Sequence, residues 1–185
     1  GAGSVKFNPV TRSGRGIAMH ERDEALDVAE ILELAHFVRG ELQERTPIDL
    51  LLGTPPALYT VGELVDLDLS RQCHVRHILG ILGSGDMALC GIGQTVPELC
   101  FGNLEETEVQ KVWFHHPVLC QLREDLLGEY PGLCRDCIHA HRCLTHCVAQ
   151  NYVDSGRLVT PHTLCAAAHE RGLFPASRLR EGEAG

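Results

Sequence analysis

The chain has 185 residues and a mass of 20.3 kDa, enough for one substantial domain or two small ones. Its 16 Lys and Arg against 25 Asp and Glu give a formal net charge of −9, which argues against a nucleic-acid partner. A hydrophobic content of 44% and a charged content of 22% are typical of a globular protein and exclude a disordered one. No apolar run approaches the roughly 18 residues of a membrane span, and the first residues do not resemble a signal peptide. We therefore expect a cytoplasmic protein without a membrane partner.

The first part of the chain predicts a strand–helix–strand unit. Residues 5–10 form a short β-type run that ends at the Gly-containing loop 11–16, and residues 48–52 form a second, more buried run. Between them, from about residue 23 to 44, apolar residues recur at the three- and four-residue spacing of a helix: Val28, Ile31, Leu32, Ala35, Val38 and Leu42. A βαβ unit implies parallel strands covered by helices, and one unit cannot close a sheet alone. We expect it to be a fragment of a larger α/β architecture.

The pattern changes between residues 60 and 70, where we place a domain boundary. Residues 73–103 are rich in Gly and have short apolar stretches that indicate hairpins, whereas residues 105–128 have the apolar stripes of helices. From residue 134 to 165 the chain holds five of its nine cysteines and four of its eleven histidines, with little apolar material. Such a segment needs stabilisation from outside a hydrophobic core, and a bound metal can supply it.

The cysteines follow an ordered pattern. Without an export signal, and with an odd count, they are poorly explained by disulfides, so metal ligation is the leading interpretation. The downstream string is C-x2-C-x5-C-x3-C followed by one more cysteine after seventeen residues; its members are Cys134, Cys137, Cys143, Cys147 and Cys165. Upstream, Cys73, Gly85 and Cys90 form C-x11-G-x4-C. Because a C-x2-C pair brings two thiolates to one metal and the further cysteines exceed one tetrahedral site, we predict at least two centres.

A zinc module is the alternative for these cysteines, because histidines lie among them and both thiolate and imidazole suit zinc. Those histidines are His139, His141, His146 and His162. A zinc ribbon normally has two C-x2-C pairs, whereas this string has one. Cys120 lies on a helical pattern and is expected to be a buried thiol, and Cys100 lies next to the predicted hairpin cysteines.

The seven-cysteine order resembles the SPASM domain that follows the catalytic barrel in many radical SAM enzymes that mature peptides and proteins. That family's pattern is C-x9–15-G-x4-C, a gap, C-x2-C-x5-C-x3-C, a gap and a final cysteine. The resemblance covers roughly residues 70–175. More weakly, the strand at 5–10, the word Gly14-Arg15-Gly16 and the long helix resemble the end of a radical SAM partial barrel.

The resemblance implies a fold, a division of the chain and a set of ligands. Residues 1–66 would be the end of the partial parallel barrel, 67–178 a small, irregular α+β SPASM-like domain, and 179–185 a flexible tail. The SPASM-like domain would hold two auxiliary iron–sulfur clusters of the 4Fe-4S type. Cys134, Cys137, Cys143 and Cys165 would bind one cluster; Cys73, Cys90 and Cys147 would bind the other.

The second set leaves one iron without a matching cysteine. The fourth ligand stays open among Asp66, Asp68, Cys100, a solvent molecule and the substrate itself. An open iron could bind a substrate thiolate as a Lewis acid holds a ligand.

The resemblance also implies an enzyme, with a 5′-deoxyadenosyl radical abstracting hydrogen from a peptide or protein substrate. The auxiliary clusters would relay electrons or anchor that substrate, and a flavodoxin or ferredoxin would serve as the external reductant. Asn8 and Arg15 follow a barrel strand, which places them on the side of S-adenosylmethionine or substrate.

The C-x3-C-x2-C motif that binds the reducing 4Fe-4S cluster of radical SAM enzymes does not occur in this chain. We therefore expect this cluster and S-adenosylmethionine to bind in an upstream half, and the chain alone, which does not begin with Met, to be inactive. The alternative function is a stand-alone electron-transfer or zinc-stabilised interaction module without catalysis.

Overall fold

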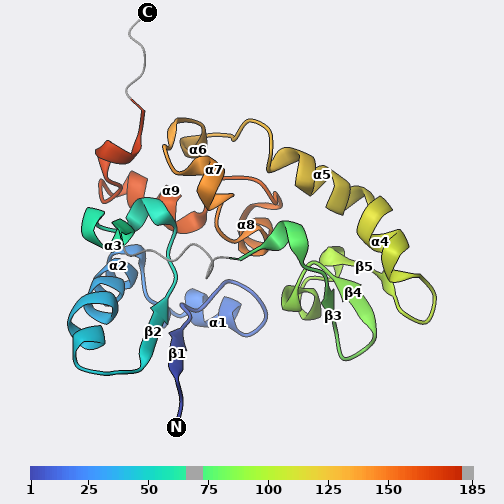
Figure 1. Cartoon of the computed structure of the whole chain (residues 1–185), viewed down its shortest axis with the longest axis horizontal. Coiled ribbons are helices and arrows are strands. Elements are labelled where there is room, and N and C mark those ends of the chain that lie inside the picture. The colour runs from blue at the N-terminus through green and yellow to red at the C-terminus, as the bar shows by residue number, and fades with distance from the viewer. Residues whose placement is uncertain (66–72, 181–185) are drawn as a thin grey trace, which may run out of the picture.

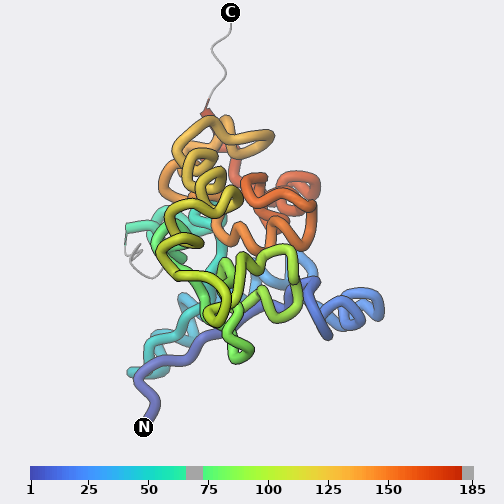
Figure 2. The backbone as a smooth tube through the Cα atoms, turned by 90° about the vertical axis from the view of Figure 1, so that its right-hand side faces the viewer, coloured from blue at the N-terminus to red at the C-terminus, as the bar shows by residue number. Residues whose placement is uncertain are grey.

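The computed structural model describes residues 1–65 and 73–180. In Figure 1 the N-terminal unit (residues 1–65) lies on the left, with strand β1 (Ser4–Phe7) at the bottom. The three-stranded sheet lies on the right, with helices α4 (Val109–His115) and α5 (Pro117–Asp125) above it. Seen from the side, the helices from α6 to α9 lie above the β1 strand (Figure 2). The N-terminal unit and the C-terminal helices therefore face each other, although they are far apart in sequence.

The N-terminal unit is a parallel strand pair with a helix between its strands, as the sequence predicted. Ser4 lies opposite Asp49 and Phe7 lies opposite Leu52. The elements of this unit, in chain order, are β1 (Ser4–Phe7), α1 (Gly16–Glu21), α2 (Val28–Phe37), a π-helix (Val38–Leu42), β2 (Asp49–Leu52), a 3-10 helix (Pro56–Leu58) and α3 (Val61–Val65).

Helix α2 begins later than the predicted residue 23 because Asp27 is a strong N-cap. Its carboxylate accepts a hydrogen bond from the backbone N–H of Glu30 (3.0 Å), and the Glu30 carboxylate accepts one from the backbone N–H of Asp27 (2.8 Å). This capping box satisfies two N–H groups that the first helical turn leaves without partners. The helix then changes into the π-helix, so the periodic stripe continues to Leu42 in a different helical form.

A three-stranded antiparallel sheet, in the order β3-β4-β5, confirms the predicted hairpins. Its β3–β4 turn depends on Gly85, the glycine of the cysteine motif, which has φ +85°. Residues other than glycine are disfavoured at positive φ because their Cβ atom clashes with the backbone. Asn103 closes the turn by donating from its amide to the Ser84 carbonyl (3.2 Å) and the Asp86 carboxylate (2.9 Å).

The elements of the second part are short. Its strands are β3 (Gly80–Ile81), β4 (Asp86–Ala88) and β5 (Cys100–Asn103). Its α-helices are α4 (Val109–His115), α5 (Pro117–Asp125), α6 (Leu133–Asp136), α7 (Ala140–Cys143), α8 (Val148–Ser155) and α9 (Thr163–Glu170). Its 3-10 helices are Val75–His77, Gly91–Gln94, Pro97–Leu99 and Ala176–Arg178.

The predicted helical stretch 105–128 is broken at His116, which has extended backbone angles and precedes Pro117. The residue before a proline is disfavoured in helical conformation, so two helices form where the apolar pattern is continuous.

One hydrophobic core crosses the expected domain boundary. Val28 and Leu58 of the N-terminal unit belong to the same buried cluster as Met87, Leu122 and Phe174. The mixed fold with an irregular α+β second part agrees with the predicted class, but the partial barrel is not confirmed. Among the described residues, the parallel sheet contains only β1 and β2.

The flexible tail was expected to begin at residue 179, but backbone contacts hold both Leu179 and Arg180. Leu179 forms an isolated antiparallel bridge with Cys137, and the backbone N–H of Arg180 donates to the Asp136 carbonyl at 2.8 Å. The ordered chain therefore extends at least to residue 180, because these hydrogen bonds anchor it beside the C-x2-C pair.

Candidate metal centre

All nine cysteines are free thiols. Four of them lie within electrostatic range of one another: Cys134, Cys137, Cys143 and Cys165. We call them the four-thiol group. Burial, followed by the neighbouring Cys137, raises the pKa of Cys134 to about 11. Burial, followed by Cys134 and Cys137, raises the pKa of Cys143 to about 12. Burial, followed by Cys143, Cys134 and Cys137, raises the pKa of Cys165.

Short helices position the four-thiol group. Cys134 lies in α6, Cys137 follows its end, Cys143 is the last residue of α7 and Cys165 lies in the first turn of α9. The C-x2-C spacing therefore spans one tight helical turn. Its backbone bends away directly after Asp136, where Cys137 is extended. The fourth thiol comes from a helix 22 residues beyond Cys143, so only the tertiary packing of α9 completes the group.

A second set of thiols, the three-thiol group, comprises Cys73, Cys90 and Cys147. Burial, followed by Cys147 and Cys90, raises the pKa of Cys73. Burial also raises the pKa of Cys90, with a further contribution from Cys147. Cys90 enters this group because the Gly85 turn returns the chain through β4, and Cys147 enters it at the N-cap of α8. The structure thus separates the seven motif cysteines into four and three.

The three residues between Cys143 and Cys147 all have left-handed backbone conformations. Their φ angles are +50° at Leu144, +60° at Thr145 and +65° at His146. Such a conformation costs roughly 1–2 kcal/mol for each residue other than glycine. The turn aims the backbone N–H groups of Thr145 and His146 at the Cys143 sulfur, where they oppose the burial that raises its pKa. It also places Cys143 and Cys147, only four residues apart, in different groups.

Cys120 and Cys100 lie apart from both groups. The Cys120 thiol donates to the Phe114 carbonyl at 3.3 Å. The Cys100 thiol lies 3.5 Å from the Gly93 carbonyl, and burial followed by the Asp86 charge raises its pKa. Asp66 and Asp68, the other protein candidates for the fourth ligand, lie outside the described residues.

A cavity of about 1150 Å³ lies between the N-terminal unit and the helices α8 and α9. Two cysteines of the three-thiol group, Cys73 and Cys147, form part of its wall. Asn8, which follows β1, lines the cavity, whereas Arg15 is exposed at the start of α1 and is not among the lining residues. Ligands of α/β folds bind at the carboxyl ends of parallel strands, and this cavity occupies that place beside β1 and β2.

Polar side chains of α8 and α9 form the cavity wall opposite the strands. The backbone N–H of Leu164 donates to Nδ1 of His162 (3.2 Å), so Nε2 of His162 carries the proton and donates to the Gln150 side-chain oxygen (3.1 Å). Burial, followed by the adjacent His146, lowers the pKa of His162 to about 3. Thr163 donates to one oxygen of Asp154, whose other oxygen is buried without a partner. This wall therefore presents neutral imidazoles and one carboxylate.

Residues 73–138 match the family model of SPASM, an iron-sulfur cluster-binding domain. This segment is similar to a SPASM domain. The matched segment includes four of the motif cysteines, and Cys143, Cys147 and Cys165 lie beyond it. Comparisons with curated proteins and with solved structures gave no match. None of the helices described is long and apolar enough to cross a membrane.

The donor chemistry of the two thiol groups fits iron–sulfur clusters. Within residues 1–65 and 73–180, no three His, Cys, Asp or Glu side chains are close enough to hold one metal ion. The thiols of each group nevertheless lie near enough to raise one another's pKa values. Thiolates alone ligate both common types of cluster. Binding would release the protons that burial retains on these thiols.

Two features near the four-thiol group have no signal in the sequence. Tyr130 is buried, donates to the Leu126 carbonyl (2.8 Å), and has its pKa raised by burial and then by Cys143 and Cys134. Arg178 is buried with only 8% of its surface exposed. No motif marks either residue, because their burial depends on how the C-terminal segment packs.

Proposed function

We propose that the chain is the cluster-binding C-terminal portion of a radical SAM enzyme that modifies a peptide or protein. The family match supports cluster binding, and SPASM domains occur in radical SAM enzymes. The observation that carries the ligand assignment is the separation of seven thiols into a group of four and a group of three. The four-thiol group provides the complete set for one auxiliary cluster, and the three-thiol group provides three ligands for the other.

The position of the cavity supports a substrate role for the three-thiol group. Its volume of about 1150 Å³ exceeds the 300–1,000 Å³ of most small-molecule sites, so a peptide segment fits it. Lys6 and Arg12 lie on the strand side of the wall, and Asp154 lies on the helix side. A substrate in this cavity would approach Cys73 and Cys147 directly, whereas no member of the four-thiol group lines the cavity.

The residues of this chain have separable tasks in that proposal. When bound, the clusters supply one-electron transfer, and an external flavodoxin or ferredoxin is the reductant. The backbone N–H groups of Thr145 and His146 favour the thiolate form of Cys143. Asn8 and the α8–α9 wall orient the substrate. Hydrogen abstraction requires S-adenosylmethionine and the cluster of a C-x3-C-x2-C motif, which this chain does not contain.

Anaerobic reconstitution of the chain, followed by counts of iron, sulfide and zinc, tests the proposal. Two four-iron clusters give about eight iron and eight sulfide per chain. Cys165→Ala should lose the cluster of the four-thiol group, Cys147→Ala should lose the other, and Cys120→Ala should lose neither. Zinc near one or two per chain without sulfide would overturn the assignment and leave a zinc-stabilised module.

A further inference from the structure

Arg178, at the end of the 3-10 helix Ala176–Arg178, is a buried cation with few partners. Its Nη2 donates to the Tyr59 carbonyl at 3.1 Å, and Nη1 donates to the Ser177 hydroxyl at 3.4 Å. Its Nε is buried and has no hydrogen-bond partner. Within the part of the chain that the structure describes, no carboxylate forms an ion pair with this guanidinium. A buried charge without a counter-ion is unfavourable, so an anion bound nearby would stabilise this part of the fold.

The segment that contains Arg178 lies beside the C-x2-C turn of the four-thiol group, whose thiols would become negatively charged thiolates when they bind a cluster. The chain containing Arg178 pairs with the C-x2-C turn, since the backbone N–H of Ile138 donates to the Arg178 carbonyl at 2.9 Å and Leu179 bridges to Cys137. Burial raises the pKa of Cys137, and the N–H of His139 followed by the charge of Arg178 opposes that rise. Arg178 therefore lies within electrostatic range of a ligand thiol.

We infer that Arg178 is the countercharge of the iron–sulfur cluster bound by the four-thiol group and raises the reduction potential of that cluster. The inference rests on the proposed function. A cluster becomes more negative when it gains an electron, so a nearby buried cation stabilises the reduced state more than the oxidised one. Net charge and hydrogen bonds to sulfur are among the terms that set such potentials.

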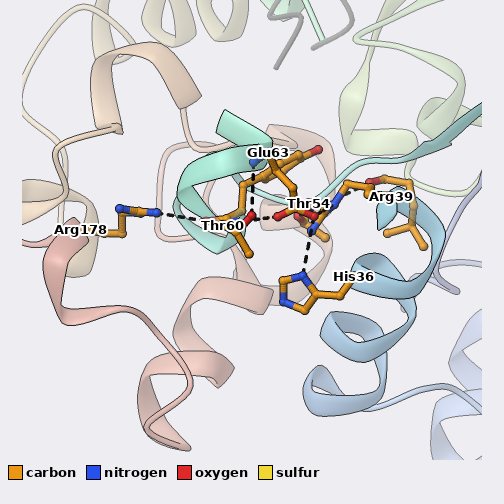
Figure 3. Close-up of polar contacts among 8 residues, drawn as sticks. His36, Arg39, Thr54, Thr60, Glu63 and Arg178 are labelled. Atoms are coloured by element: carbon orange, nitrogen blue, oxygen red, sulfur yellow. Dashed lines mark hydrogen bonds and ion pairs between the residues drawn. The ribbon is translucent and has the colours of Figure 1, made fainter. Parts of the chain in front are cut away.

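The N-terminal unit holds this guanidinium in position (Figure 3). The Tyr59 carbonyl that accepts from Arg178 belongs to the residue whose ring lies under the guanidinium of Arg39, 3.9 Å from ring centre to Cζ. Arg39 in turn donates to Glu63 (2.7 Å) and Thr54 (3.0 Å). A residue from the cavity wall therefore connects, through Tyr59, to the cation beside the four-thiol group.

Redox titration of the reconstituted full chain, followed by electron paramagnetic resonance, tests the inference. Arg178→Gln and Arg178→Met should lower the midpoint potential of the four-thiol cluster. Arg178→Lys keeps the charge, so its midpoint potential should stay close to that of the wild type. Arg135→Gln is the control, since Arg135 lies only two residues from Cys137 but has a side chain that is 71% exposed. Its shift should be several times smaller because water and salt screen exposed charges. The cluster of the three-thiol group, identified by its loss in Cys147→Ala, should keep its potential throughout.

Neutral variants with a wild-type potential would overturn the inference. If neither neutral variant retains the four-thiol cluster while Arg178→Lys does, the requirement for a charge is supported. If Arg178→Lys binds the four-thiol cluster but lowers its midpoint potential several times more than Arg135→Gln does, the charge is not what sets the potential, and the inference is overturned. A wild-type chain that binds no iron at the four-thiol group would instead overturn the proposed function, and the metal count distinguishes this result from the others.

Discussion

The Asp27 carboxylate accepts a hydrogen bond of 2.6 Å from the guanidinium of Arg171, 144 residues further along the chain. Asp27 is the N-cap of α2, and Arg171 is the C-cap of α9. The contact therefore joins the start of α2 to the end of α9, the helix that carries Cys165. It anchors the N-terminal unit on the last element of the candidate metal centre.

Substitutions at this contact should separate capping from ion pairing. Asp27→Asn keeps a good N-cap and loses the ion pair, as does Arg171→Gln, so each should destabilise the protein slightly. Asp27→Ala loses the cap as well and should destabilise it most. Urea unfolding measures the stability of each variant. The double variant Asp27→Asn with Arg171→Gln should be no less stable than either single variant. Additive losses would show that the two side chains act independently.

Gly85 should be required for the turn that returns Cys90 to the three-thiol group. Gly85→Ala forces a side chain to φ +85°, which should cost about 1–2 kcal/mol and reduce iron loading at this group. Gly83→Ala in the same turn is the control, because a Cβ there meets nothing within 4 Å. Unfolding curves and iron counts of the two variants provide the comparison; equal stability would refute the importance of the turn.

The stability of the protein should fall below neutral pH partly because His162 is buried in the neutral form. Its pKa is lowered to about 3 by burial and then by His146, whereas the unfolded chain has the ordinary value of about 6.5. The unfolded state therefore binds the proton first as the pH falls below 6.5. Each pH unit lost between about 6 and 3 should reduce the free energy of unfolding by up to about 1.4 kcal/mol.

His162→Asn removes this titration and keeps a residue that can cap α9, as His162 does by accepting from Leu164. The free energy of unfolding of the wild type and of the variant is measured at pH 7.5 and 5.5. The decrease between the two pH values should be larger in the wild type. An unchanged difference between the two proteins at the two pH values would exclude His162 as the source.

Arg39 should be the main polar anchor of the N-terminal unit. Its side chain is 10% exposed and its partner Glu63 is 20% exposed. Arg39→Ala should destabilise the protein by roughly 2–3 kcal/mol, below the value for fully buried pairs because Glu63 is partly solvated. Arg45→Ala, which removes a helical ion pair that is 67% exposed on both sides, should cost no more than about 0.5 kcal/mol. Thermal or urea unfolding compares them; similar losses would contradict the burial argument.

Much of the local structure could be predicted from the sequence. Apolar patterning and turn residues located the elements of the βαβ unit and the hairpins, because each strand or helix has a local periodicity of apolar residues. They missed the start of α2 at Asp27 and the break at His116, since capping and proline chemistry end helices where the apolar pattern continues. The order of seven cysteines indicated the family, which the match of residues 73–138 supports.

Thiol chemistry and spacing are local properties, so the sequence by itself determined that this chain has seven cysteines in the order of an iron–sulfur-binding pattern. Only the tertiary structure brought Cys165 beside the C-x2-C pair and separated Cys147 from Cys143 through three left-handed residues. It also buried Arg178 beside Cys137, from which it is separated by about forty residues of chain. Burial and electrostatic range depend on the packing of distant segments, and no spacing in the sequence encodes them.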